Sequence, residues 1–242
     1  MNKIISQTPE ELGKLAAAQA ADLINSAISE NGSCRLLLAT AASQLETLAS
    51  LQKKDIDWSK VEVFHLDEYI GLPETHSASF VSLLKERFIK GIGPLKSVCF
   101  IDGMAPPEEA IAKVTAEIRR APIDVALVGI GENAHIAFND PPADFETVDA
   151  YRVVTLDDAC RRQQHGEGWF PTFDDVPKTA ISMTVYQIMQ SKVIISVVPH
   201  IQKAKAVFDT LNNEPTPDIP ATILKTHPNW TLYLDIHSAS LL

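Results

Sequence analysis

The sequence has 242 residues, of which 45% are hydrophobic and 21% charged, so it can form an ordinary hydrophobic core without stabilisation by disulfides or metal ions. A formal net charge of −10 argues against proteins that bind nucleic acid through a basic surface. The three cysteines lie far apart and form no CxxC pair, which predicts neither a disulfide framework nor a metal site. The N-terminal segment lacks the apolar core of a signal peptide, and no apolar run reaches the roughly 20 residues of a membrane helix. We therefore expect a cytoplasmic protein without a membrane segment.

A helix begins the predicted order of elements. Thr8 is a good N-cap, Pro9 suits the first helical position, and Glu11 follows Thr8 by three residues, which is the spacing of a capping box. The Ala- and Leu-rich segment that follows is expected to end at Asn31 and Gly32. The next expected elements are a strand at 34–40, a helix at 44–51, a strand at 61–66, and helices at 76–89 and 106–120.

The second half of the chain continues the alternation of strands and helices. Strands are predicted at 124–129, 180–184, 192–198 and 231–235, with a helix at 203–211. This order is typical of a mostly parallel sheet covered by helices on both faces. We therefore expect a single three-layer α/β/α domain over residues 1–242 with a Rossmann-like sheet. Residues 140–176 lack a clear period, which predicts a lid over an active site.

Three polar clusters directly follow predicted strands. They are Thr40-Ala41-Ala42-Ser43, Asp67-Glu68-Tyr69, and the stretch at 129–135. Because parallel sheets bind ligands at the carboxyl ends of their strands, we expect the clusters to meet around one site. Taken alone, the carboxylate pair is also explained by a helix cap, and the GxG of the third cluster by a tight turn. The third cluster lacks the last glycine of a dinucleotide fingerprint, so no nucleotide cofactor is expected.

Two blocks of sequence resemble the signature blocks of glucosamine-6-phosphate deaminases. They are LDEYIGLPETHSASF at 66–80 and GIGENAHIAFNDPP at 129–142. The stretches at 174–207 and 226–235 resemble the same family in the same order, so the resemblance runs from about Cys34 to the end. It implies conversion of an amino-sugar 6-phosphate into a ketose 6-phosphate and ammonia, without a metal or an organic cofactor.

The resemblance implies a role for each of three acid–base groups. Asp67 matches the aspartate that moves a proton between carbons C2 and C1 of the sugar. His135 matches the histidine that assists ring opening, a task that suits an imidazole titrating near neutrality. Asp140 stands where a glutamate usually orients that histidine, so its reach is shorter by one methylene group.

The phosphate of the substrate is expected at the turn after the first predicted strand. The family's glycine-rich turn reads Thr40-Ala41-Ala42-Ser43 here, so backbone N–H groups and two hydroxyls would have to hold the anion. Lys203 matches the family lysine that contacts the phosphate, and Gly131 is a further candidate for binding substrate. The resemblance also implies an arginine of the lid that reaches the phosphate. Arg161 or Arg162 is a candidate for it, and an ordinary surface role explains either residue equally well.

One departure from the family pattern keeps the function open. Asn133 replaces a carboxylate that normally joins the ring-opening group, and an amide forms hydrogen bonds but cannot accept a proton. The alternatives are a 6-phosphogluconolactonase in which His135 activates water, and a sugar-phosphate-binding protein without activity. Family members differ in oligomeric state, so a homo-oligomer is among the alternatives.

Overall fold

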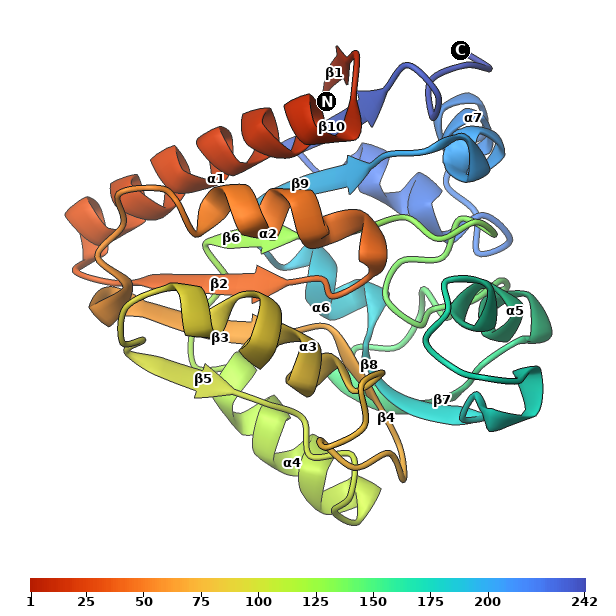
Figure 1. Cartoon of the computed structure of the whole chain (residues 1–242), viewed down its shortest axis with the longest axis horizontal. Coiled ribbons are helices and arrows are strands. Elements are labelled where there is room, and N and C mark those ends of the chain that lie inside the picture. Colours follow the sequence, from red (N-terminus) through yellow and green to blue (C-terminus); the bar gives the residue numbers. More distant parts are fainter.

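A seven-stranded parallel sheet forms the centre of the computed structural model, which describes all residues from Met1 to Leu242. In spatial order its strands are β1 (Asn2–Ser6), β10 (Trp230–Asp235), β9 (Val193–Val198), β6 (Val125–Leu127), β2 (Cys34–Leu38), β3 (Val61–His65) and β5 (Ser97–Cys99). Every neighbouring pair is parallel, as Figure 1 shows. The expected mostly parallel sheet is therefore confirmed.

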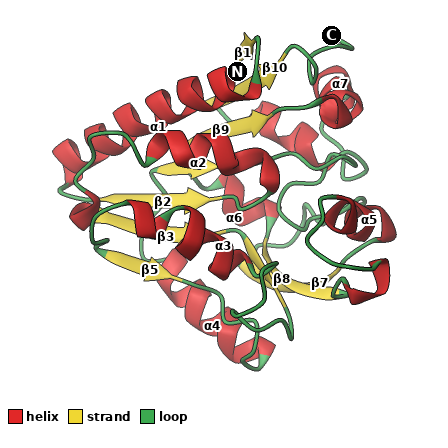
Figure 2. Ribbon diagram, in the orientation of Figure 1, coloured by secondary structure: helices red, strands yellow, loops and turns green.

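Helices cover both faces of this sheet (Figure 2). The helices are α1 (Pro9–Asn31), α2 (Leu45–Leu51), α3 (Phe80–Arg87), α4 (Pro107–Ile118), α6 (Val185–Met189) and α7 (Ala204–Asn212). On β2, Leu36 and Leu38 pack into the core shared with α1, α2 and α3, whereas Leu37 packs on the opposite face with α4, α6 and α7. This alternation follows from the two-residue period of a strand, and it confirms the three-layer α/β/α arrangement.

The caps of α1 agree with the signals in its sequence. The Thr8 hydroxyl accepts a hydrogen bond from the backbone N of Glu11 at 3.2 Å. Gly32 ends the helix with φ 75°, a left-handed conformation that favours glycine. Within the helix, a β-carbon on Gly13 would lie 2.9 Å from the backbone of Glu46, so the glycine allows α1 and α2 to approach closely. No helix of the structure combines the length and apolar character needed to cross a membrane.

A second, antiparallel sheet lies beside the first, and the sequence does not predict it. It has the order β4 (Asp67–Tyr69), β8 (Thr179–Met183), β7 (Tyr151–Thr155). The chain leaves the main sheet at the end of β3 and enters this one at Asp67, which pairs with Ser182. Residues 140–176, for which no regular element is predicted, contain β7 and a helix, α5 (Asp158–Gly166). In Figure 1 both α5 and α7 lie beyond the arrowheads of the parallel strands.

Candidate active site

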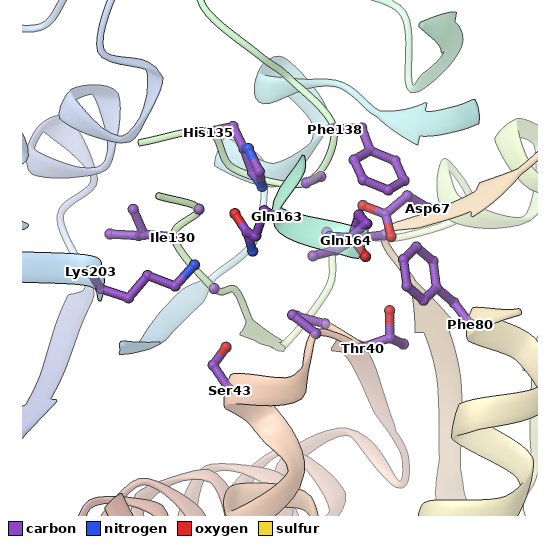
Figure 3. A pocket seen from close by; sticks show the side chains of 16 residues that line it. Thr40, Ser43, Asp67, Phe80, Ile130, His135, Phe138, Gln163, Gln164 and Lys203 are labelled. Carbon is purple, nitrogen blue, oxygen red and sulfur yellow. The ribbon is translucent and has the colours of Figure 1, made fainter. Parts of the chain in front are cut away.

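A cavity opens at the carboxyl ends of the parallel strands and collects most of the predicted site residues. Its lining includes Thr40, Ala41, Ser43, Asp67, Gly131, His135 and Lys203. Figure 3 shows Asp67 and His135 entering from separate elements, with Lys203 at the far end. Ala42 lines an adjoining outer basin that shares Ser43, Gln163 and Lys203 with the cavity. The structure therefore brings together residues that lie far apart in the sequence.

Asp67 presents an unpaired carboxylate to this cavity. The residue is only 7% exposed, and no protein group donates a hydrogen bond to its carboxylate. Burial, helped by the neighbouring charge of Glu68, raises the pKa of Asp67 to about 8. Phe80 and Phe138 form an apolar wall beside it (Figure 3). A carboxylate in this environment is a much stronger base than one in water, which suits proton abstraction from carbon.

Glu68 points to the other side of the strand and has a structural role at the start of α3. Its carboxylate accepts hydrogen bonds from the Ser79 hydroxyl at 2.7 Å and from the backbone N of Val81 at 2.9 Å. Burial raises the pKa of Glu68, although these accepted hydrogen bonds lower it. Ser79 is the N-cap of α3, so Glu68 holds the start of that helix in place. The helix-cap interpretation of the carboxylate pair therefore applies to Glu68 and not to Asp67.

His135 and Asp140 form a buried pair across the cavity from Asp67. The imidazole Nδ1 lies 3.0 Å from Asp140 Oδ1, which leaves Nε2 as the nitrogen available to a ligand. Burial raises the pKa of Asp140, but its contacts with His135 and Asn133 outweigh this and hold it below its ordinary value. The shorter carboxylate at this position therefore still reaches the imidazole and can orient it.

Asn133 lies behind this pair and does not line the inner cavity. Its Nδ2 donates to Asp140 Oδ1 at 3.1 Å and to Asp157 Oδ2 at 3.3 Å. Its Oδ1 accepts a hydrogen bond from the backbone N of His135 at 3.2 Å. The amide is thus fully engaged in holding the histidine loop, and its side chain faces only the outer basin. Asp157 is not among the residues that the sequence predicts for the site.

The far end of the cavity is cationic. Lys203 is buried, and burial lowers its pKa although Glu167 and Glu132 act in the opposite direction. The turn before Lys203 contains His200 with φ 80°, a strained conformation for a residue other than glycine. The backbone N of Lys203 donates to His200 O at 3.1 Å, so this turn sets the direction of the lysine. Ser43 faces the same region from the short helix after β2.

The two candidate arginines of the 140–176 segment have different environments. Arg161 is buried and donates hydrogen bonds to the carbonyl oxygens of Phe173 at 3.0 Å and Val176 at 3.2 Å. Arg162 is exposed and lines the outer basin beside Lys203. Arg161 therefore stabilises its own segment, and Arg162 is the one that faces the site.

Two further residues of the cavity are missed by the sequence analysis. Gln163 and Gln164 lie on α5 and line the cavity next to His135 and Asp67 (Figure 3). Tyr69 donates its hydroxyl hydrogen to Gln164 Oε1 at 3.0 Å, which turns the amide nitrogen of Gln164 away from the tyrosine. The only signal in the sequence is a pair of amides next to the arginines of the predicted lid.

Three potential metal ligands also meet at this centre. Atoms of His135, Asp140 and Cys160 lie within 4.8 Å of one another. Burial, followed by the nearby charge of Asp140, raises the pKa of Cys160 far above its ordinary range. Metals bind the thiolate, so this environment suits a packed thiol better than a ligand.

Known proteins are similar to this chain over its whole length. A family model described as glucosamine-6-phosphate isomerases/6-phosphogluconolactonase matches residues 7–233. A glucosamine-6-phosphate deaminase of Bacillus cereus (strain G9842) is 33% identical over 242 residues, covering 100% of this chain and 89% of the relative. One from Lactobacillus delbrueckii subsp. bulgaricus (strain ATCC BAA-365 / Lb-18) is 32% identical over 243 residues, covering 100% of both chains.

Solved structures extend the comparison to the fold. The structure of a monomeric glucosamine-6-phosphate deaminase of the NagB superfamily superposes with a TM-score of 0.91 at 30% identity, covering 100% of both chains. A putative 6-phosphogluconolactonase from Neisseria gonorrhoeae superposes with a TM-score of 0.79 at 19% identity, covering 97% of this chain and 99% of the other. The second likeness shows the fold alone. Because the family model spans nearly the whole sequence and relatives align from end to end, the chain belongs to the family of glucosamine-6-phosphate isomerases and 6-phosphogluconolactonases.

Proposed function

We propose that the protein converts glucosamine 6-phosphate, or a close stereoisomer, into a ketose 6-phosphate and ammonia. The observation that carries the proposal is the environment of Asp67, an unpaired carboxylate whose pKa burial raises to about 8, across one cavity from the His135–Asp140 pair. Relatives with the name glucosamine-6-phosphate deaminase, aligned over the whole chain, support it.

The cavity offers the substrate two distinct ends. The phosphate would lie against Lys203 and the Ser43 hydroxyl, with Arg162 approaching from the outer basin. These groups supply the local cations that a protein of net charge −10 needs to hold an anion. With the phosphate there, the sugar would extend along Phe80 and Phe138 toward Asp67.

The chemistry follows from this placement. His135 would transfer a proton between the anomeric hydroxyl and the ring oxygen, so that the ring opens to the aldehyde. Asp67 would then remove the proton from C2. The electron pair of the C–H bond would form the C1=C2 bond of an enolamine, while the π electrons of the aldehyde move to its oxygen, which takes up a proton and becomes the enol hydroxyl. Return of a proton to C1 gives an imine at C2, and water adds to this imine to release ammonia and leave the ketone. The step needs a positioned base and hydrogen-bond donors.

We further propose that the 140–176 segment acts as a lid over the bound sugar. Its helix α5 contributes Gln163 and Gln164 to the cavity and Arg162 to the outer basin. Because Gln164 Oε1 already accepts from Tyr69, its amide N–H groups are free to donate to a hydroxyl of the sugar. Closure of such a segment would exclude water from the enolamine.

The proposal is tested by measuring ammonia release from glucosamine 6-phosphate by the protein and by Asp67→Asn. The isosteric amide cannot accept the C2 proton, so we expect a loss of about a thousandfold or more in kcat. Asp218→Asn, an exchange at an exposed carboxylate, is the matched control and should keep full activity. Ammonia release undiminished in Asp67→Asn would contradict the role of Asp67.

The same assay separates the alternatives. Hydrolysis of a 6-phosphogluconolactone without ammonia release from the amino sugar would favour a lactonase in which His135 activates water. Calorimetric binding of the amino-sugar phosphate without turnover would favour a binding protein without activity.

A further inference from the structure

A chain of polar contacts runs from His135 into the start of α5 through two carboxylates and one amide. The amide of Asn133 stands between Asp140 and Asp157 and gives each of them one hydrogen, at 3.1 and 3.3 Å. The carbonyl oxygen of the same side chain accepts from the backbone N of His135. Three hydrogen bonds thus fix the orientation of the Asn133 side chain, with both amide hydrogens in use.

Asp157 contacts the pair in a second way. Its backbone N donates to Asp140 Oδ2 at 3.1 Å, and its Oδ1 accepts from the backbone N of Cys160 at 2.6 Å as the N-cap of α5. One residue thus joins the carboxylate that orients His135 to the helix that carries Gln163 and Gln164. The imidazole of His135 and the buried Cys160 thiol also face the cluster. On its other side, the ion pair of Asp144 and Arg152 lines a cavity together with Asp140 and Asp157.

We propose that Asp157 is a positioning residue of the active site and that it makes an amide at position 133 obligatory in this chain. Asp157 acts through Asn133 and Asp140 and does not touch the sugar. The proposal rests on the function given above, because its consequence for turnover passes through His135. It explains why Asn133 need not weaken the site, since this chain has its second carboxylate at 157.

The charges of Asp140 and Asp157 determine which side chains position 133 can accept. An aspartate at 133 would place three carboxylates in a row, with oxygen atoms 3.1 and 3.3 Å apart and no hydrogen between them. Carboxylates in such contact cannot all ionise at a site partly shielded from water, so one must take up a proton or the row must separate. Either change withdraws Asp140 from His135. An asparagine at 157 would create the opposite conflict, because its amide nitrogen would face the Asn133 nitrogen as the oxygen accepts from Cys160.

The exchange of the two residues provides the test. Asn133→Asp is expected to lower kcat by roughly 10- to 100-fold, the effect of moving a supporting hydrogen-bond partner, with KM within about threefold. Asp157→Asn keeps a good N-cap but creates the donor conflict, and should lower kcat by about fivefold or more. In the double variant the new amide at position 157 can donate to the new carboxylate at position 133, which removes one of the two carboxylate contacts and leaves the one with Asp140. The kcat should therefore recover in part, by about threefold over Asn133→Asp alone. Asp158→Asn, at the exposed neighbouring carboxylate, is the control and should leave kcat unchanged.

Thermal unfolding supplies a readout that does not depend on turnover. In Asn133→Asp, a new carboxyl kept protonated by its neighbours destabilises the fold at any pH above the unfolded-state pKa, and the cost grows as pH rises. The Tm of Asn133→Asp should therefore fall further below wild type at pH 8 than at pH 5, and the double variant should regain part of it. Additive effects of the two changes on both kcat and Tm would overturn the proposal. Absence of ammonia release by the wild type would instead contradict the proposed function. The Tm values of the wild type, the two single variants and the double variant would still test the coupling between positions 133 and 157.

Discussion

The imidazole of His135 lies against Gly131 so closely that it occupies the place of a side chain. A β-carbon built on Gly131 would overlap both Cε1 and Nε2 of the ring. Glycine is therefore required here by a catalytic group and not by a turn, and Nε2 is held at a defined place in the cavity wall.

Gly131→Ala should displace the imidazole while leaving the fold intact, because the clash is with the end of one side chain. We expect kcat to fall by roughly 10- to 100-fold, as a displacement of about 1 Å is enough for such a loss. Steady-state kinetics measures the change, and Gly93→Ala, where a β-carbon meets open space, is the matched control. An alanine variant as active as wild type would show that the position of the ring does not matter.

The activity should rise with pH toward an apparent pKa set by Asp67. Burial, together with Glu68, raises the pKa of this carboxyl to about 8, and only the ionised form can accept the C2 proton. We therefore expect kcat/KM to increase through neutral pH and to level off above about pH 9. A kcat/KM that already reaches its plateau at about pH 5 would contradict the low-dielectric environment of Asp67.

The same shift makes Asp67 costly to the stability of the fold. Its folded-state pKa of about 8 lies above the unfolded value of ~3.9, so the stability lost at this site grows as pH rises between those values. Asp67→Asn removes this dependence and should be more stable than wild type by ~1 kcal/mol or more at pH 8. The gain should vanish near pH 4. Denaturant unfolding at both pH values measures it, and equal stability at pH 8 would argue against the shift.

Substitution of the two adjacent arginines should change different properties, KM for Arg162 and the free energy of unfolding for Arg161. Arg162→Gln removes a cation from the outer basin and should raise KM for the phosphorylated substrate by about threefold to tenfold, with little change in Tm. Arg161→Gln leaves the buried carbonyl oxygen of Val176 and the partly buried one of Phe173 without their guanidinium donor, and should lower the free energy of unfolding by about 1–3 kcal/mol. Kinetics and unfolding of the two variants side by side check the assignment. A KM effect confined to Arg161→Gln would reverse it.

Some of this site is predictable from the sequence because it depends on strand ends. The apolar runs at 34–40, 61–66 and 124–129 predict parallel strands, and the polar residues at their ends must meet at one edge of the sheet. The structure places β2, β3 and β6 within these runs. That rule alone is enough to bring Thr40, Asp67 and His135 to a common place. The caps of α1 are equally local, since Thr8 and Gly32 act on their own helix.

Other features depend on contacts between distant residues and have no local signal. The strand expected at 61–66 is followed directly by β4 in a different sheet, and β4 is defined only by its pairing with β8. The helix predicted from 76 begins at Phe80, because Glu68 and Ser79 fix its first turn. Asp157 meets Asn133 across 24 positions, and nothing in the sequence around either residue indicates the partner.

Turnover in D₂O tests whether Asp67 is the single base that transfers the proton on one face of the sugar. Asp67 approaches the enolamine from one wall of the cavity, so the ketose product should carry deuterium at only one of the two prochiral positions of C1, as NMR can determine. Asp67→Asn should form no such product at a comparable rate. Deuterium at both positions of C1, or undiminished product formation by Asp67→Asn, would contradict the account.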